Sequence, residues 1–230
     1  MSAFKKEIPP QGSRAMFEFS KENDAKIKKT IKKYPEGRQA SAVKSLLDMA
    51  QRQNGGWLPK EAMDVVAERL DMPPMKVYEV ATFYTMFNLE PIGKHHVKIC
   101  GTTPCWLRGS DDLFAVCKSK LGVTDGQTSA DGNFTVSEVE CMGACVNAPM
   151  VQIGDDYLED LDIESFGSII DALQAGKKIT PGPQIQRQKA APASGLTSLV
   201  EDLASVKKAK TKKTPAAKNA STLKPKKGDA

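Results

Sequence analysis

The chain has 230 residues, of which 40% are hydrophobic and 27% charged, and its net charge at pH 7 is +5. These values are ordinary for a soluble globular protein of one or two domains. The sequence contains no run of about 18 apolar residues and no N-terminal apolar stretch of the secretory kind. We therefore expect no transmembrane helix and a reducing, cytosolic compartment for the five cysteines.

The first part of the chain predicts helices. Residues 1–22 mix Pro, Gly and Lys without periodicity and predict a flexible N-terminal arm. Over residues 23–90 apolar residues recur at helical spacing, and prolines and glycines divide the stretch into four helices. We expect the first helix to have its N-cap at Asp24, and the third and fourth to begin at Pro59 and Pro74. Short connections make neighbouring helices antiparallel, which predicts a helical bundle.

From residue 91 the apolar pattern changes to that of a mixed α/β domain, which we expect to extend to residue 180. The expected elements are a strand at 96–100, a helix at 111–121, a strand at 134–141, a hairpin at 150–158 and a helix at 162–175. The last helix is expected to bury Ile163, Phe166, Ile169, Ile170 and Leu173. The order β-α-β-β-β-α is close to a thioredoxin-like fold. The predicted fold class is therefore α+β.

The positive charge lies in the last part of the chain. Residues 181–230 contain eleven Lys and Arg against three Asp and Glu, whereas residues 1–180 contain 22 against 25. A composition rich in Lys, Ala and Pro cannot build a core, so we expect this tail to be mostly disordered. Within it, aliphatic residues at helical spacing predict a docking helix over 196–206. A lysine run at a chain end is usually only a solvated tail, so we expect no nucleic-acid binding.

Four of the five cysteines form two spaced pairs, and each pair follows a stretch that alternates like a strand. The pairs are Cys100 with Cys105, and Cys141 with Cys145. Thiolates at two loop tips can converge on one point if the strands before them are neighbours in a sheet. This pattern indicates a metal site or a redox site.

Several chemistries compete for these cysteines. Structural zinc usually needs shorter spacings, and a catalytic dithiol needs C-x-x-C at a helix N-terminus. A disulfide framework fits poorly with a reducing compartment. A [2Fe–2S] cluster explains more, because it needs two longer loops with backbone N–H groups near the sulfurs, which Gly101 and Gly143 would permit. Spacing alone favours iron–sulfur over zinc and leaves zinc open.

Several motifs carry a resemblance that covers about residues 20–178. They are Val80-Ala81-Thr82-Phe83-Tyr84, Pro91-x-Gly93, Cys100-Gly101-Thr102-Thr103-Pro104-Cys105, Asp131-Gly132-x-Phe134, and the stretch from Val139 to Met150 that contains Cys141-Met142-Gly143-Ala144-Cys145. With these motifs the chain resembles the thioredoxin-like [2Fe–2S] subunit, of the 24 kDa type, of the NADH-dehydrogenase module of respiratory complex I. The tail beyond about residue 182 lies outside the resemblance.

The resemblance implies a function and a set of partners. It implies one [2Fe–2S] cluster ligated by Cys100, Cys105, Cys141 and Cys145, with no catalytic residue in this chain. It implies a partner subunit that holds FMN, NADH and a [4Fe–4S] cluster, so this chain alone would not oxidise NADH. It also implies a place among the peripheral-arm subunits on the cytoplasmic face of a bacterial inner membrane, without insertion.

Two other functions stay open at this point. A similar [2Fe–2S] subunit serves NAD-linked formate dehydrogenases and hydrogenases, and the motifs alone do not separate these hosts. The third possibility is a zinc module with a nucleic-acid-binding tail.

Other conspicuous side chains receive structural interpretations. Cys117 shares a helix face with apolar residues, so we expect it in the core. His95 and His96 lie at a strand entrance without cysteines at a suitable spacing, so we expect no ligation by them. Three aromatic residues near the end of the helical stretch could suggest a flavin pocket, but we expect core or domain-interface packing: Phe83, Tyr84 and Phe87.

Overall fold

The computed structural model describes residues 17–195 and residue 198, so the helix expected over 196–206 lies outside the described residues except for this one position. The chain separates into two compact units, residues 1–184 and 185–230. All helices and strands given below belong to the first unit. No helix among the described residues is long and apolar enough to cross a membrane.

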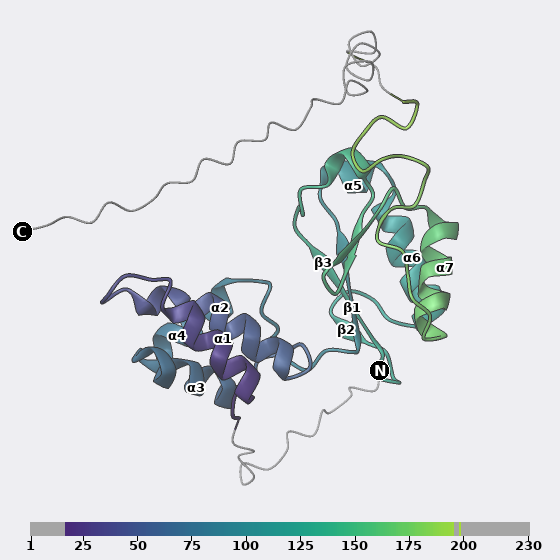
Figure 1. Cartoon of the computed structure of the whole chain (residues 1–230). Helices are drawn as coiled ribbons and strands as arrows, with labels where there is room; N and C mark the ends of the chain where they lie inside the picture. The colour runs from purple at the N-terminus through teal and green to yellow at the C-terminus, as the bar shows by residue number, and fades with distance from the viewer. Residues whose placement is uncertain (1–16, 196–197, 199–230) are drawn as a thin grey trace, which may run out of the picture. The chain divides into compact units, whose positions relative to one another are not determined.

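From residue 17 onward, the N-terminal part of the first unit contains four α-helices and one short 3₁₀-helix. They are α1 (Lys21–Ile31), η1 (Gln39–Ala42), α2 (Val43–Gln53), α3 (Lys60–Leu70) and α4 (Pro74–Phe83). Their apolar faces meet in one core that includes Ile27, Leu46, Leu47, Val66 and Val77. Figure 1 shows these helices packed side by side.

The start of α1 differs from the expectation. Ser20 is the N-cap residue, and its hydroxyl accepts a hydrogen bond from the backbone N–H of Asn23 at 3.2 Å. Asp24 lies inside the helix and forms an ion pair with Arg69 at 2.9 Å, so its expected role as the N-cap was wrong. Phe19, which we expected in the arm, is buried in the helical core.

The end of α4 also differs from the expectation. Val77 and Ala81 are buried, and Phe87 joins the same core. Phe83, however, follows Ala81 by two residues, which places it about 200° away around the helix. We expected core or domain-interface packing; Phe83 is 77% exposed, so core packing was wrong for this residue, and domain-interface packing stays a prediction.

The second part of the first unit is a six-stranded mixed sheet with helices. Its strands are β1 (His95–Cys100), β2 (Gln127–Thr128), β3 (Phe134–Val139), β4 (Val151–Ile153), β5 (Asp156–Glu159) and β6 (Gly182–Pro183), in the order β2-β3-β1-β4-β5-β6. β1 is parallel to β3, and β5 is parallel to β6, whereas the other neighbouring strands are antiparallel. Residues 182–183 lay in the expected tail, but they extend the sheet beside β5.

Two long helices cover one face of this sheet. α6 (Ser110–Leu121) and α7 (Ile163–Gln174) lie side by side on the same face in Figure 1. Their buried side chains, among them Leu113, Cys117 and Phe166, pack with Val97 and Ile99 of β1. Alternate residues of β1 thus enter the core, as the period of a strand requires.

Cys117 and Ile163 were both expected in the core, and only Cys117 lies there. Cys117 is fully buried in this core, as expected, and burial raises the pKa of its thiol to about 12. Ile163 is 58% exposed, so its expected burial was wrong. It is the first residue of α7, directly after the N-cap Asp162, and the buried face of the helix begins at Phe166.

His96 on β1 predicts an unusual titration. Its Nε2 lies 2.8 Å from Ser137 Oγ, and within the described residues its buried Nδ1 has no hydrogen-bond partner. Burial, with the nearby charge of Lys98, lowers the pKa of His96 to about 4. Because the unfolded chain binds the proton more readily between pH 6.5 and about 4, this histidine makes folding less favourable as the pH falls through that window.

The titration can be followed directly, since the chain has only two histidines. We expect the NMR signals of the His96 ring to keep their neutral positions down to below pH 5, with His95→Gln used to assign them. A midpoint near 6.5, the ordinary value for histidine, would contradict the burial argument.

Candidate metal centre

The two cysteine pairs lie at one edge of the sheet. β1 and β3 are parallel neighbours, and Cys100, the last residue of β1, is in register with Val139, the last residue of β3. The carboxyl ends of parallel neighbours meet at the same edge, so the loop that carries Cys141 starts beside Cys100. The condition for convergence, that the strands before the two pairs are neighbours in the sheet, is therefore met.

The first pair is buried. After Cys100 the chain turns into the short helix α5 (Thr103–Leu107), which we did not predict, and α5 carries Cys105. Both cysteines are 1% exposed and pack with Ala148 and Met150. The Cys100 backbone N–H donates to the Met150 carbonyl oxygen at 3.3 Å, which fixes the end of the strand.

The second pair is exposed. The Sγ atoms of Cys141 and Cys145 are 3.5 Å apart. Gly143 between them has φ +82°, a left-handed conformation that favours glycine. Its backbone N–H points to Cys141 Sγ at 3.4 Å, as expected for a loop that surrounds sulfur atoms. The Tyr157 hydroxyl donates to the Met142 carbonyl oxygen at 3.2 Å and holds the loop against the sheet.

The role expected for Gly101 differs from the one observed. Its backbone N–H donates to the Val139 carbonyl oxygen at 3.2 Å and not to a sulfur atom. A Cβ at this position would meet the Glu138 carboxylate, which is the far end of an exposed, flexible side chain and can move away. This contact alone does not require glycine.

Residues after the second pair support the site, and spacing arguments did not find them. Asn147 is buried, and its side-chain amide donates to Asp160 Oδ2 at 3.1 Å. The Asp160 backbone N–H donates back to the Asn147 carbonyl oxygen at 2.7 Å. The next peptide bond, Ala148–Pro149, is cis. The two hydrogen bonds between Asn147 and Asp160 hold this loop, in which Ala148 packs against the buried thiols.

The buried thiols influence one another. Burial raises the pKa of Cys100, but hydrogen bonds from Thr102, Cys105 and the Met142 backbone outweigh it, and the net shift is downward. For Cys105, burial and the hydrogen bond to Cys100 raise the pKa to about 11. Cys100 is thus the thiol of this pair that loses its proton first.

The exposed thiols are paired in the same way. The hydrogen bond from the Gly143 N–H, followed by that from Cys145, lowers the pKa of Cys141. The hydrogen bond to Cys141 and partial desolvation raise the pKa of Cys145. Each pair therefore contains one sulfur that accepts a hydrogen bond and one that keeps its proton. Metal binding would displace both protons, because metals bind the thiolate form.

The arrangement suits a binuclear group better than a single ion. A zinc ion needs four ligands within about 2.0–2.3 Å of one point. Within the described part of the chain, no three or more His, Cys, Asp or Glu side chains are grouped in a way that could hold a metal ion. The thiols instead form two close pairs, one buried and one exposed. Two pairs of thiolates are the donor set of a [2Fe–2S] cluster.

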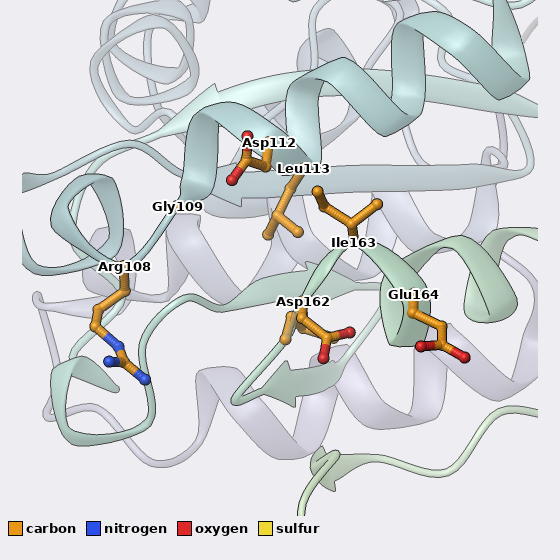
Figure 2. A pocket seen from close by; sticks show the side chains of 8 residues that line it. Arg108, Gly109, Asp112, Leu113, Asp162, Ile163 and Glu164 are labelled. Carbon is orange, nitrogen blue, oxygen red and sulfur yellow. The ribbon is translucent and has the colours of Figure 1, made fainter.

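A separate pocket lies next to this site. It has a volume of about 320 Å³ and lies between the start of α6 and the start of α7. Figure 2 shows Asp112 and Leu113 on one side and Asp162, Ile163 and Glu164 on the other, with Arg108 at its rim. The Arg108 Nε donates a long hydrogen bond of 3.5 Å to the Ala148 carbonyl oxygen. No cysteine lines this pocket, so it is not the thiol site.

Comparison with known proteins identifies the family. Residues 27–174 match the family model of the thioredoxin-like [2Fe-2S] ferredoxins, and the chain belongs to this family. The resemblance carried by the motifs is thereby confirmed. Membership also assigns one [2Fe–2S] cluster to the chain and a thioredoxin-like fold to its mixed α/β part.

Two relatives make the comparison more specific. An NADH-quinone oxidoreductase subunit of Rickettsia bellii is 58% identical over 158 residues, which cover 69% of this chain and 95% of the relative. The mitochondrial NADH dehydrogenase [ubiquinone] flavoprotein 2 of Dictyostelium discoideum is 49% identical over 185 residues, which cover 80% of this chain and 75% of the relative.

A solved structure shares the fold. An NAD+-reducing [NiFe]-hydrogenase in its H2-reduced state matches with a TM-score of 0.52 and 21% identity. The match covers 58% of this chain and only 22% of the hydrogenase chain. At this level of identity the similarity concerns the fold alone.

Proposed function

We propose that this chain is the [2Fe–2S] electron-transfer subunit of an NADH–quinone oxidoreductase. The observation that carries the proposal is the convergence of two thiol pairs at one sheet edge. It occurs in a chain that matches 95% of the length of the Rickettsia bellii oxidoreductase subunit. The similarity to the NAD+-reducing hydrogenase concerns the fold alone. A subunit of a hydrogenase or of a formate dehydrogenase is therefore the second candidate and not the first.

We assign the four thiolates as the ligands. Cys100 and Cys105 would hold one iron, and Cys141 and Cys145 the other. When bound, the cluster accepts and releases one electron at a time. The backbone N–H groups of Gly143 and Met142 face sulfur atoms and offset negative charge there.

The two pairs have different roles in this assignment. Ala148 and Met150 cover the inner thiols and exclude water from them. Cys141 and Cys145 are exposed, so this edge is where another redox centre could approach most closely. Electrons would therefore enter and leave on the side of the second pair.

The partner that fits this role is a subunit carrying FMN, the NADH site and a [4Fe–4S] cluster. The chain would lie with other peripheral-arm subunits on the cytoplasmic face of a bacterial inner membrane, without insertion. We expected an arm over residues 1–22, but Phe19, Ser20 and the start of α1 already belong to the helical bundle. We therefore divide the chain into an arm that ends before Phe19, a helical bundle (up to residue 90), a ferredoxin domain (91–180, with β6 added) and a tail from about residue 184. Because the NADH site and the FMN belong to the partner subunit, this chain alone should not oxidise NADH.

Purification from native cells through a tag on this chain tests the proposal. We expect a flavin-containing NADH-oxidising subunit and quinone-reducing activity to co-purify with the chain. Co-purification with a hydrogenase or a formate dehydrogenase catalytic subunit would instead identify the second candidate. A chain recovered alone, with no flavoprotein under mild conditions, would contradict both.

A further inference from the structure

The hydroxyl of Thr102 is aimed at the sulfur atoms. Thr102 lies between β1 and α5, and its Oγ1 is 3.3 Å from Cys100 Sγ. Cys100 belongs to the buried pair, so this hydroxyl lies against one of the two inner sulfur atoms.

The hydroxyl is not occupied by the usual task of a threonine at this position. Thr102 is the N-cap residue of α5, where threonine commonly accepts a hydrogen bond from a backbone N–H of the first turn. Its side chain makes no such capping bond, and Pro104 removes one of the N–H groups that would need it. The direction of the hydroxyl is therefore set by the sulfur atoms and not by the helix.

The direction of hydrogen bonding follows from the chemistry of the ligands. When thiolates bind metal, Cys100 keeps no proton, so only the Thr102 O–H can donate in this contact. Reduction places additional negative charge on the ligand sulfurs. A donor aimed at them stabilises the reduced state more than the oxidised state.

We propose that Thr102 tunes the [2Fe–2S] cluster of this chain, by donating a hydrogen bond from its hydroxyl to Cys100 Sγ and thereby raising the reduction potential. This inference rests on the proposed function, because it assumes that these cysteines ligate the cluster. Thr102 acts on the cluster only through its cysteine ligand, so it is a positioning residue and not a catalytic one.

The test compares three variants of the full chain loaded with its cluster. Thr102→Val keeps the shape and removes the hydroxyl, whereas Thr102→Ser keeps the hydroxyl. Thr103→Val is the matched control, because Thr103 is exposed and adjacent but makes no hydrogen bond to a cysteine sulfur among the described residues. The readout is the midpoint potential from a spectroscopic redox titration.

We expect Thr102→Val to lower the ratio of reduced to oxidised cluster about tenfold at a fixed ambient potential. For a one-electron couple this corresponds to a midpoint potential that is lower by about 59 mV. Thr102→Ser and Thr103→Val should remain near the unsubstituted chain. If Thr102→Val assembles too little cluster to titrate, Thr102→Ala decides in the same way. Equal potentials for the chains with and without the hydroxyl would overturn the tuning role. A native chain without any iron–sulfur cluster would instead contradict the proposed function.

Discussion

Replacement of Cys141 by alanine is expected to abolish cluster binding while the fold persists. The side chain is exposed, so its loss should change the free energy of unfolding of the cluster-free chain by no more than about 0.5 kcal/mol. The same change leaves one iron with a single protein thiolate. We expect the visible absorbance, iron and acid-labile sulfide of the purified variant to fall to background.

Cys117→Ser is the matched control for this prediction. Cys117 is a cysteine of the same domain, but it is buried among Leu113, Phe166 and their neighbours. A hydroxyl without a partner at this position should cost about 1–3 kcal/mol of stability and leave the cluster in place. Equal loss of iron and sulfide from both variants would show that the assignment of the ligands is wrong.

Phe166→Ala is expected to destabilise the ferredoxin domain by about 3–5 kcal/mol. Phe166 is fully buried and joins α7 to the core beneath β1. Its removal loses apolar burial and leaves a cavity that the neighbouring helices fill only in part. Urea denaturation followed by circular dichroism, with all variants in the same cluster state, measures the difference.

Ile163→Ala provides the control on the same helix. Ile163 is apolar and lies three residues before Phe166, but its side chain is 58% exposed. We expect its replacement to change the free energy of unfolding by about 0.5 kcal/mol or less. A loss as large as that of Phe166→Ala would mean that the start of α7 is buried, contrary to this structure.

The convergence of the cysteines could be predicted from the sequence, because two regular patterns combine. Each pair follows a stretch with the period of a strand, and parallel strands that are neighbours bring their carboxyl ends together. Core positions in the middle of elements, such as Cys117 and Phe166, follow the same logic. Periodicity is informative where a residue lies well inside an element.

Element ends were less predictable, because local hydrogen bonds decide them. Ser20 and not Asp24 caps α1, since the Ser20 hydroxyl reaches the Asn23 N–H. Ile163 precedes the buried Phe166 by three residues, but it is the first residue of α7, where the helical period no longer determines burial.

The finer features of the site also escaped prediction. The helix α5 has five residues, too short for a periodic signal. The loop of the second pair is held by Asp160, which accepts from Asn147 across 13 residues of sequence, and by Tyr157, which donates to Met142 across 15. These contacts depend on the folded arrangement and have no local signature.

The most direct test of the central claim, one [2Fe–2S] cluster held by the two thiol pairs, is metal and sulfide analysis of the chain. The chain is purified anaerobically, and the measurement is combined with electron paramagnetic resonance after reduction. We expect two irons and two acid-labile sulfides per chain, with a one-electron paramagnetic signal on reduction. Stoichiometric zinc with no labile sulfide would contradict the claim.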